Sequence, residues 1–342
     1  MIGLMDAANY AYAYGWVSAL PQSLGKEIYE KLITARSIDE VVATLAGTAY
    51  SDEIQDGIKK HGDKEALVDV TAIEKAITSH YVHICKAVIS ALPMGVRDGA
   101  RAIMMDEWDV VNLKRIARGV TIGKRGEEII SELGAVGNIN ETKLSEAASG
   151  DLRIALEKIR DFGYELNTNE TNLFKIESEL DAQLINIWLT ECEKVHELRD
   201  AVRTQIDMLN LKSILRYKLG NIDASEFIEN SVTGKHFHRE ILKEIHSAGF
   251  DAVPDILAKT PYGDTFHDAF DDFKKSGSPE KLELQIEKIL SGYVIQAQPL
   301  SLNFIISYLR RMRIDARNIR VILVCKKHNI PPEEIRELLV SV

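Results

Sequence analysis

A short glycine-containing run is the part of the sequence that most resembles a phosphate-binding loop. It reads GVTIGKRG from Gly119 to Gly126, so that glycines flank a lysine. Only three residues separate Gly119 from Gly123, where such a loop needs four, and Arg125 replaces the serine or threonine that would hold Mg²⁺. No apolar strand pattern precedes the run. We therefore interpret it as a connecting loop and expect no nucleotide site in this chain.

Histidines are the other residues that could do chemistry. A metal site on a helix needs ligands at positions i and i+4 of one face, with a third ligand close by. His80 and His83 are only three apart, and Cys85 lies on a different face. Solvated or partly buried side chains are the favoured interpretation, with metal binding as the alternative. The same two interpretations apply to the remaining candidates, His236, His238 and His246. The sequence contains no Ser/His/Asp order, no G-x-S-x-G and no dinucleotide loop, so we expect no catalytic residue, no metal and no cofactor.

One arginine cluster stands out in an otherwise acidic chain. It lies between Tyr308 and Arg320 and contains Arg310, Arg311, Arg313, Arg317 and Arg320. The cluster could be a solvated face that pairs with the protein's own carboxylates. It could equally contact an acidic partner or lipid head groups, with Arg310, Arg311 and Arg313 as possible partner contacts.

Composition restricts the class of protein. The 342 residues are 45% hydrophobic and 27% charged, which is typical of a folded, globular chain. A net charge of −10 argues against general nucleic-acid binding, which needs clustered Lys and Arg. The three cysteines are far apart and form no CxxC pair, so we expect reduced thiols in a cytosolic protein.

The N-terminal stretch from Ala7 to Gly25 carries no charge, which raises the question of a membrane span. It includes Asn9, Pro21, Gln22 and three tyrosines, however, and few large aliphatic residues. The preceding Asp6 also argues against a signal peptide. A buried first helix is the better interpretation, and any link to a membrane then runs through a partner.

Apolar periodicity predicts helices throughout, and we expect an all-α fold. One stripe lies between Glu65 and Leu92, and a second runs from Leu173 to Leu189. Helix starts are indicated by Ser37-x-x-Glu40, by Asp223-x-x-Glu226 and by Pro332. The first stripe comprises Ile73, Ile77, Tyr81, Ile84 and Val88, and the second Leu173, Ile176, Leu180, Leu184, Ile187 and Leu189.

The sequence repeats itself three times. The pattern D-x-x-N-[LI]-[KR]-x-I recurs, and its asparagines are spaced 98 and then 108 positions apart. Sixteen residues after each asparagine comes a glutamate: Glu128, Glu226 and Glu334. An I-E step precedes each copy, and the run LAGTAY ending in Tyr50 matches LAKTPY ending in Tyr262, with Tyr164 ending a weaker middle version. The three copies are Asp109, Asn112, Leu113, Lys114 and Ile116; Asp207, Asn210, Leu211, Lys212 and Ile214; and Asp315, Asn318, Ile319, Arg320 and Ile322.

Markers in a constant order predict three related helical units, 1–136, 137–233 and 234–342, with joints near Gly134 to Gly137 and near Gly234. Three similar units suggest a pseudo-threefold arrangement around a central space. The motif Asp and Asn lie three apart and share a helix face. A partner site would be used once, whereas this motif occurs three times. We therefore expect each Asn to satisfy backbone groups where helices meet, and each Asp to cap a helix or pair with a nearby Lys or Arg. Partner contact is the alternative.

Four blocks of the sequence resemble the C subunit of archaeal-type (A/V-type) rotary ATPases, a family similar to the d subunit of vacuolar ATPases. They are NYAYAYGWVSAL at the start, WDVVNLKRIARG, DMLNLKSILRYKLG and YLRRMRIDARNIRVIL. The resemblance covers nearly the whole chain, and its ordered triplet is the specific part. Arg313 departs from it, because the family often has an acidic residue two positions before the third motif Asp.

The resemblance implies a funnel of three similar helical domains around a central cavity. It also implies a non-catalytic rotor protein that sits on the cytoplasmic face of the cell membrane, between the proteolipid ring and the central-stalk subunits. No small-molecule substrate or nucleic acid is expected as a partner. The alternatives are a stand-alone helical scaffold for protein interaction and an enzyme with an unrecognised site.

Overall fold

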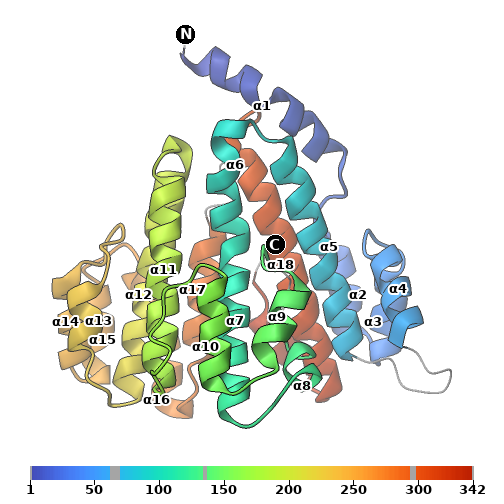
Figure 1. Cartoon of the computed structure of the whole chain (residues 1–342). Helices are drawn as coiled ribbons and strands as arrows, with labels where there is room; N and C mark the ends of the chain where they lie inside the picture. Colours follow the sequence, from blue (N-terminus) through green and yellow to red (C-terminus); the bar gives the residue numbers. More distant parts are fainter. Residues whose placement is uncertain (1, 62–69, 134–136, 293–297, 341–342) are drawn as a thin grey trace.

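The computed structural model describes residues 2–61, 70–133, 137–292 and 298–340. Every regular element in these ranges is helical and none is a strand, so the predicted all-α class is confirmed. Long helices run roughly parallel through the middle of the molecule, and short helices surround them (Figure 1). The helix α1 crosses one end of the long helices and contacts α18 and α5.

The predicted unit boundaries divide these helices into three sets that are built in the same order. Each set contains two central helices, which we call its long helices: α5 and α7, α11 and α12, and α17 and α18. A run of other helices precedes them, and one short helix ends each set. The first set contains α1 (Ile2–Ala19), α2 (Lys26–Thr34), α3 (Ile38–Leu45), α4 (Ser51–His61), α5 (Val70–Ala91), α6 (Met94–Arg101), the π-helical η1 (Ala102–Asp106), α7 (Glu107–Thr121) and α8 (Glu127–Ile130). The second contains α9 (Glu141–Ala148), α10 (Leu152–Asp161), α11 (Leu173–Cys192), the 3₁₀ turn η2 (His196–Leu198), α12 (Arg199–Leu219) and α13 (Ser225–Asn230). The third contains α14 (Arg239–Ser247), the 3₁₀ turn η3 (Phe250–Ala252), α15 (Val253–Leu257), α16 (Gly263–Ser276), α17 (Glu280–Gly292), α18 (Leu302–Lys327) and α19 (Pro332–Leu338).

Local signals explain most of the helix starts. Ser37 caps α3 by accepting from the Glu40 N–H, as predicted, and α19 begins at Pro332. The Asp223 prediction was wrong in detail, because Asp223 accepts from the Ser225 N–H while Ala224 is the N-cap of α13. The repeated glutamates Glu128, Glu226 and Glu334 all lie in the first turn of the short helix that ends each set, where the helix dipole favours a negative charge.

The apolar stripes bury the long helices. The predicted stripe of α5 is buried along its full length, although residues 65–69 of the predicted segment lie outside the described ranges. On α11, Ile176, Leu180 and Leu184 are buried, while Leu173, Ile187 and Leu189 are only partly covered. One hydrophobic core extends from the first set into the second and into α18, so the sets share a core.

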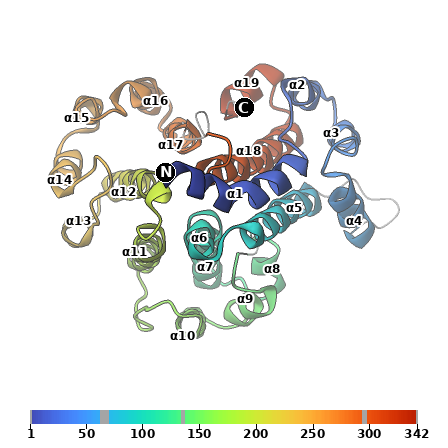
Figure 2. The ribbon, with the colours of Figure 1, turned by 90° about the horizontal axis from the view of Figure 1, so that it is seen from above.

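The long helices pack in a closed cyclic order. The second long helix of each set packs against the first long helix of the next: α7 on α11, α12 on α17, and α18 on α5. The last contact closes the circle, as Figure 2 shows, with the short helices on the outside. We name these three contacts the 1–2, 2–3 and 3–1 junctions. The division into three domains and the funnel around a central cavity remain predictions.

Candidate functional site

The motif aspartates are buried, and each one accepts hydrogen bonds from the segment that leads into the next set of helices. Asp109 accepts from the N–H groups of Asn138 and Ile139 at 2.8 and 3.1 Å. Both donors precede α9. At most 2% of any of the three aspartates is exposed, so these bonds satisfy buried backbone donors.

The other two copies repeat this arrangement. Asp207 accepts from the His236 and Phe237 N–H groups, both at 2.8 Å, just before α14. Asp315 accepts from the Leu24 N–H at 2.7 Å, just before α2. The third copy therefore reaches back to the first set, and the backbone caps follow the same cyclic order as the helix packing.

Two tyrosines complete the aspartate sites. Tyr262 donates to Asp207 Oδ2 at 3.1 Å, and Tyr29 donates to Asp315 Oδ1 at 2.5 Å. Tyr262 ends the LAKTPY marker, so this repeated tyrosine is part of the same site as the motif. Burial raises the pKa of Asp315 to about 6, because the hydrogen bonds offset only part of the desolvation. Burial also raises the pKa of Asp109 and that of Asp207.

Glycines allow the chain to approach two of these carboxylates. A Cβ at Gly137 would lie 2.4 Å from Asp109 Oδ1, and a Cβ at Gly234 would lie 2.0 Å from Asp207 Oδ1. Both contacts are far shorter than real Cβ atoms allow. These are the glycines that we placed at the predicted joints; Gly134 and residues 135–136 of the first joint lie outside the described ranges.

Two of the motif asparagines hold the chain that returns after the short helix ending their set. Asn210 Nδ2 donates to the Val232 carbonyl at 2.8 Å, and Asn318 exchanges two hydrogen bonds with Val340, at 2.9 and 3.0 Å. Asn112 is fully buried. These contacts match the expectation that the asparagines satisfy backbone groups where helices meet.

The basic residue of each copy spans one junction. Lys114 pairs with Asp181 of α11 at 2.5 Å, and both side chains are nearly buried. Lys212 lies 4.0 Å from Glu283 of α17, and Arg320 lies 3.3 Å from Glu74 of α5. Since each pair crosses a different junction, the motif as a whole joins neighbouring sets.

The residues two positions before the motif aspartates meet at the centre of the ring. They are Glu107, Gln205 and Arg313. Arg313 Nη1 donates to Glu107 Oε2 at 2.7 Å, and its guanidinium lies 5.5 Å from the ring of Trp108. Burial opposes the ionisation of Glu107, but the charge of Arg313 outweighs it and lowers the pKa of that carboxyl.

The arginine cluster of α18 is divided between the interior and the surface. Arg310 is 8% exposed, and Arg313 is engaged with Glu107 and Trp108. Arg311 is half-buried, and no described carboxylate lies within ion-pair distance of it. Partner contact through Arg310, Arg311 and Arg313 remains a prediction, for which Arg311 is the candidate without an ion-pair partner among the described residues.

The other candidates from the sequence do not converge on one site. The Gly119–Gly126 run joins α7 to α8, and Arg125 donates to the carbonyl of Val120 at 2.9 Å. His80 contacts Glu53 at 2.7 Å. Among the described residues, no group of three His, Cys, Asp or Glu side chains is placed to hold a metal ion. Cys85, Cys192 and Cys325 are buried free thiols, and burial raises the pKa of Cys85 and that of Cys192 to about 12.

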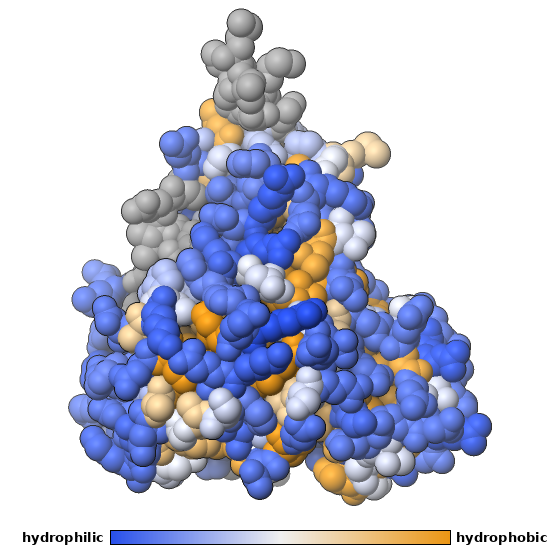
Figure 3. Space-filling view, turned by 90° about the vertical axis from the view of Figure 1, so that its left-hand side faces the viewer, coloured by the Kyte–Doolittle hydropathy of each residue, from blue (hydrophilic) through white to orange (hydrophobic). Residues whose placement is uncertain are grey.

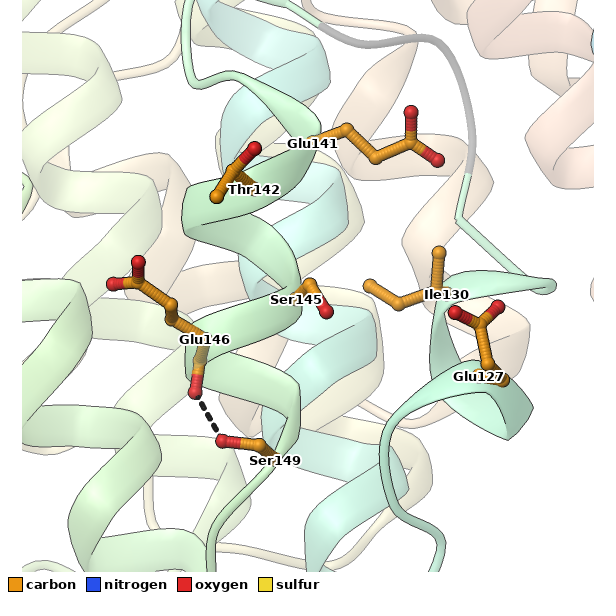
Figure 4. Close-up of a pocket in the computed structure, with 7 residues that line it drawn as sticks. All are labelled: Glu127, Ile130, Glu141, Thr142, Ser145, Glu146 and Ser149. Atoms are coloured by element: carbon orange, nitrogen blue, oxygen red, sulfur yellow. Dashed lines mark hydrogen bonds between the residues drawn. The ribbon is translucent and has the colours of Figure 1, made fainter.

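The surface hollows offer little chemistry. One lies between α8 and α9, where the carboxylates of Glu127, Glu141 and Glu146 point in different directions (Figure 4). The face on the side of α13–α15 is mostly hydrophilic, with hydrophobic surface between the charged side chains (Figure 3). A hollow of about 180 Å³ between α11, α12 and α13 is lined by Phe174, Tyr217 and Phe227. The Tyr217 ring stacks on Phe227 and meets Phe174 edge to face.

Comparison with known proteins gives one consistent result. The sequence model of the ATP synthase (C/AC39) subunit family matches residues 22–338. The chain is 26% identical to the C subunit of the A-type ATP synthase of Methanocaldococcus jannaschii, over 99% of this chain and 88% of that protein. It is 25% identical to the protein of the same name from Methanosphaera stadtmanae, over 98% and 89%. For that of Desulfurococcus sp. (strain SY) the identity is 22%, over 96% and 90%.

Proposed function

Because the chain belongs to the ATP synthase (C/AC39) subunit family, we propose that it connects the proteolipid ring of an A-type ATP synthase to the central-stalk subunits. The relatives are named as the C subunit of that synthase, which is a structural rather than a catalytic part. The finer role, transmission of torque between a membrane ring and a shaft, is our inference from the way the helices are joined.

The observation that carries this proposal is the closed ring of long helices with a motif copy at every junction. A rotor part must turn as one body and must not deform when torque is applied. Close-packed helices resist deformation, and buried backbone caps tie each set to the next. A chain in which the sets were joined only by flexible linkers would dissipate torque at the linkers.

The location follows from the same proposal. None of the helices in the described ranges combines the length and the apolar character needed to cross a bilayer. We place the protein at the cytoplasmic face of the cell membrane, held peripherally through the ring. A stable grip on such a partner would bury a standard interface, roughly 1,600 Å² in total.

The test is to assemble the synthase with and without this chain. We expect the complex without it to hydrolyse ATP at the catalytic head but to pump no ions, and adding the chain back should restore pumping. Equal pumping in both preparations would contradict the proposal. Purification from native membranes provides a second check, because the chain should co-migrate with ring and stalk subunits, whereas a stand-alone scaffold would not.

A charge reversal addresses the arginine cluster separately. Arg311→Glu is expected to weaken assembly with the ring or the stalk, measured by co-purification, because Arg311 is free to meet an acidic surface. Arg153→Glu on α10 serves as the control, since Arg153 is an exposed arginine and its pair with Glu157 lies within one helix. Intact assembly of the Arg311 variant would remove the arginine cluster from the interface.

A further inference from the structure

A small cavity at the centre of the ring contains more positive than negative charge. It has a volume of about 40 Å³ and lies between α12, α17 and α18. Its charged lining consists of Arg310, Arg313 and Arg317 from one face of α18 and of Glu287 from α17. Since Glu107 neutralises Arg313, the three guanidinium groups exceed the nearby carboxylates by one charge.

Arg317 is the arginine that lacks a carboxylate partner. Its Nη1 donates only to uncharged oxygens, Asn318 Oδ1 at 3.4 Å and the Leu338 carbonyl at 3.3 Å. Within the described residues no Asp or Glu approaches it to ion-pair distance. Burial lowers the pKa of its guanidinium, and the charge of Glu287, which lines the same cavity, offsets only part of this effect. A partly buried charge is stabilised by a further counter-charge beside it.

Gln205 provides a second, independent sign that the cavity is incomplete. It is 7% exposed, lines the cavity, and its Oε1 has no hydrogen-bond partner. No hydrogen bond joins its amide to any other described residue. Buried amides are normally paired, and an unpaired one points to a bound water, ion or ligand. Because the two ends of an amide exchange by a half-turn, Gln205 can present its N–H donors to the cavity.

We propose that this cavity binds one small monovalent anion of the size of chloride or bromide, held by Arg317 and Gln205 beside the Arg313–Glu107 pair. The volume is sufficient for one such ion or for a few water molecules, and is too small for a nucleotide or a sugar. The ion would supply the missing negative charge and join α12 of the second set to α18 of the third. This site is independent of the proposed coupling role.

Bromide is the probe that locates the site directly. Crystals of the full chain grown in sodium bromide should show an anomalous difference peak in the cavity, within hydrogen-bonding distance of Arg317 and Gln205. Absence of a peak there, or peaks only on the outer surface, would overturn the proposal.

Thermal unfolding tests the site in solution. At constant ionic strength, replacing gluconate by bromide should raise the melting temperature of the wild type in a saturable way. We expect Arg317→Gln to increase the half-saturating concentration at least tenfold, and Gln205→Leu to do the same. The exposed Arg153→Gln should behave as the wild type. An unchanged bromide response in Arg317→Gln would refute the assignment even if Gln205→Leu fails to fold, because Arg317 is only partly buried.

Discussion

Replacing Gly234 with alanine is expected to open the 2–3 junction. The new Cβ would lie 2.0 Å from Asp207 Oδ1 and 2.8 Å from the Arg203 carbonyl oxygen. The carboxylate must then move by about 1 Å or more to reach a normal contact distance. Its hydrogen bonds to the His236 and Phe237 N–H groups, now 2.8 Å each, would exceed hydrogen-bonding range.

The cost follows from these two bonds. A hydrogen bond to a charged group contributes about 1.5–3 kcal/mol, and a buried donor left without a partner is penalised further. Burial already raises the pKa of the Asp207 carboxyl, so its charge is unfavourable where it lies. Moving the carboxylate therefore recovers part of the lost free energy. Alanine also stiffens the unfolded chain by about 0.4–1 kcal/mol. We expect a net loss of about 3 kcal/mol in the free energy of unfolding.

Urea unfolding followed by tryptophan fluorescence measures this loss. Gly249→Ala is the matched control, since a Cβ there meets nothing within 4 Å, and its effect should stay within about 1 kcal/mol of the wild type. The shorter side chain of Asp207→Ser should make room for the methyl group. Gly234→Ala should therefore cost less than half as much in that background. If Gly234→Ala matches Gly249→Ala, or costs the same in both backgrounds, the argument from steric contact with Asp207 is refuted.

Two further predictions concern the other contacts of the motif. Lys114→Met should destabilise the fold by about 3 kcal/mol in urea unfolding, because it leaves Asp181 buried without a partner, and Lys114→Met with Asp181→Leu should recover most of the loss. Lys212→Met, at a more exposed and longer pair, should cost less than about 1 kcal/mol, and an equal cost at both sites would contradict this reasoning. Asp315, whose pKa is raised to about 6 in the folded state, should contribute stability below about pH 4 that is lost as the pH rises through 6. The unfolding free energy of the wild type relative to Asp315→Asn should therefore fall by about 3 kcal/mol over that range, and a flat difference would show that the carboxyl is not desolvated.

The helices were predictable because their signals are local. The stripe of α5 and the Ser37 cap depend on residues within a few turns, and hydrophobic periodicity reports them directly. The repeated motif was predictable as a structural feature, because three copies of a polar pattern are unlike a partner site that is used once. Its partners were less accessible. Asp109 binds the N–H groups of residues 29 and 30 positions later, and Asp207 repeats these two separations.

That constant separation, together with Gly137 and Gly234 just before the donors, was a signal in the sequence that could have identified two of the three caps. The third could not be found in this way. Asp315 binds Leu24 and Tyr29, which lie nearly the whole chain away, and only closure of the ring brings them together. The Arg313–Glu107 pair has the same origin, because side chains from α18 and α7 meet only when the cyclic order is complete. Contacts that form only when the ring of helices closes leave no pattern among neighbouring residues of the sequence.

The centre of the ring shows why three copies of one unit cannot remain identical. A residue that points to the axis in one copy meets its counterparts from the other two. Three glutamates there would place like charges together among partly buried side chains, which is unfavourable. The chain has Glu107, Gln205 and Arg313 at these positions, so that one negative, one neutral and one positive side chain share the centre. The junction residues face a different neighbour in each copy and escape this conflict, which explains why the aspartate and asparagine of the motif are retained in all three copies while the residue two positions earlier differs in each.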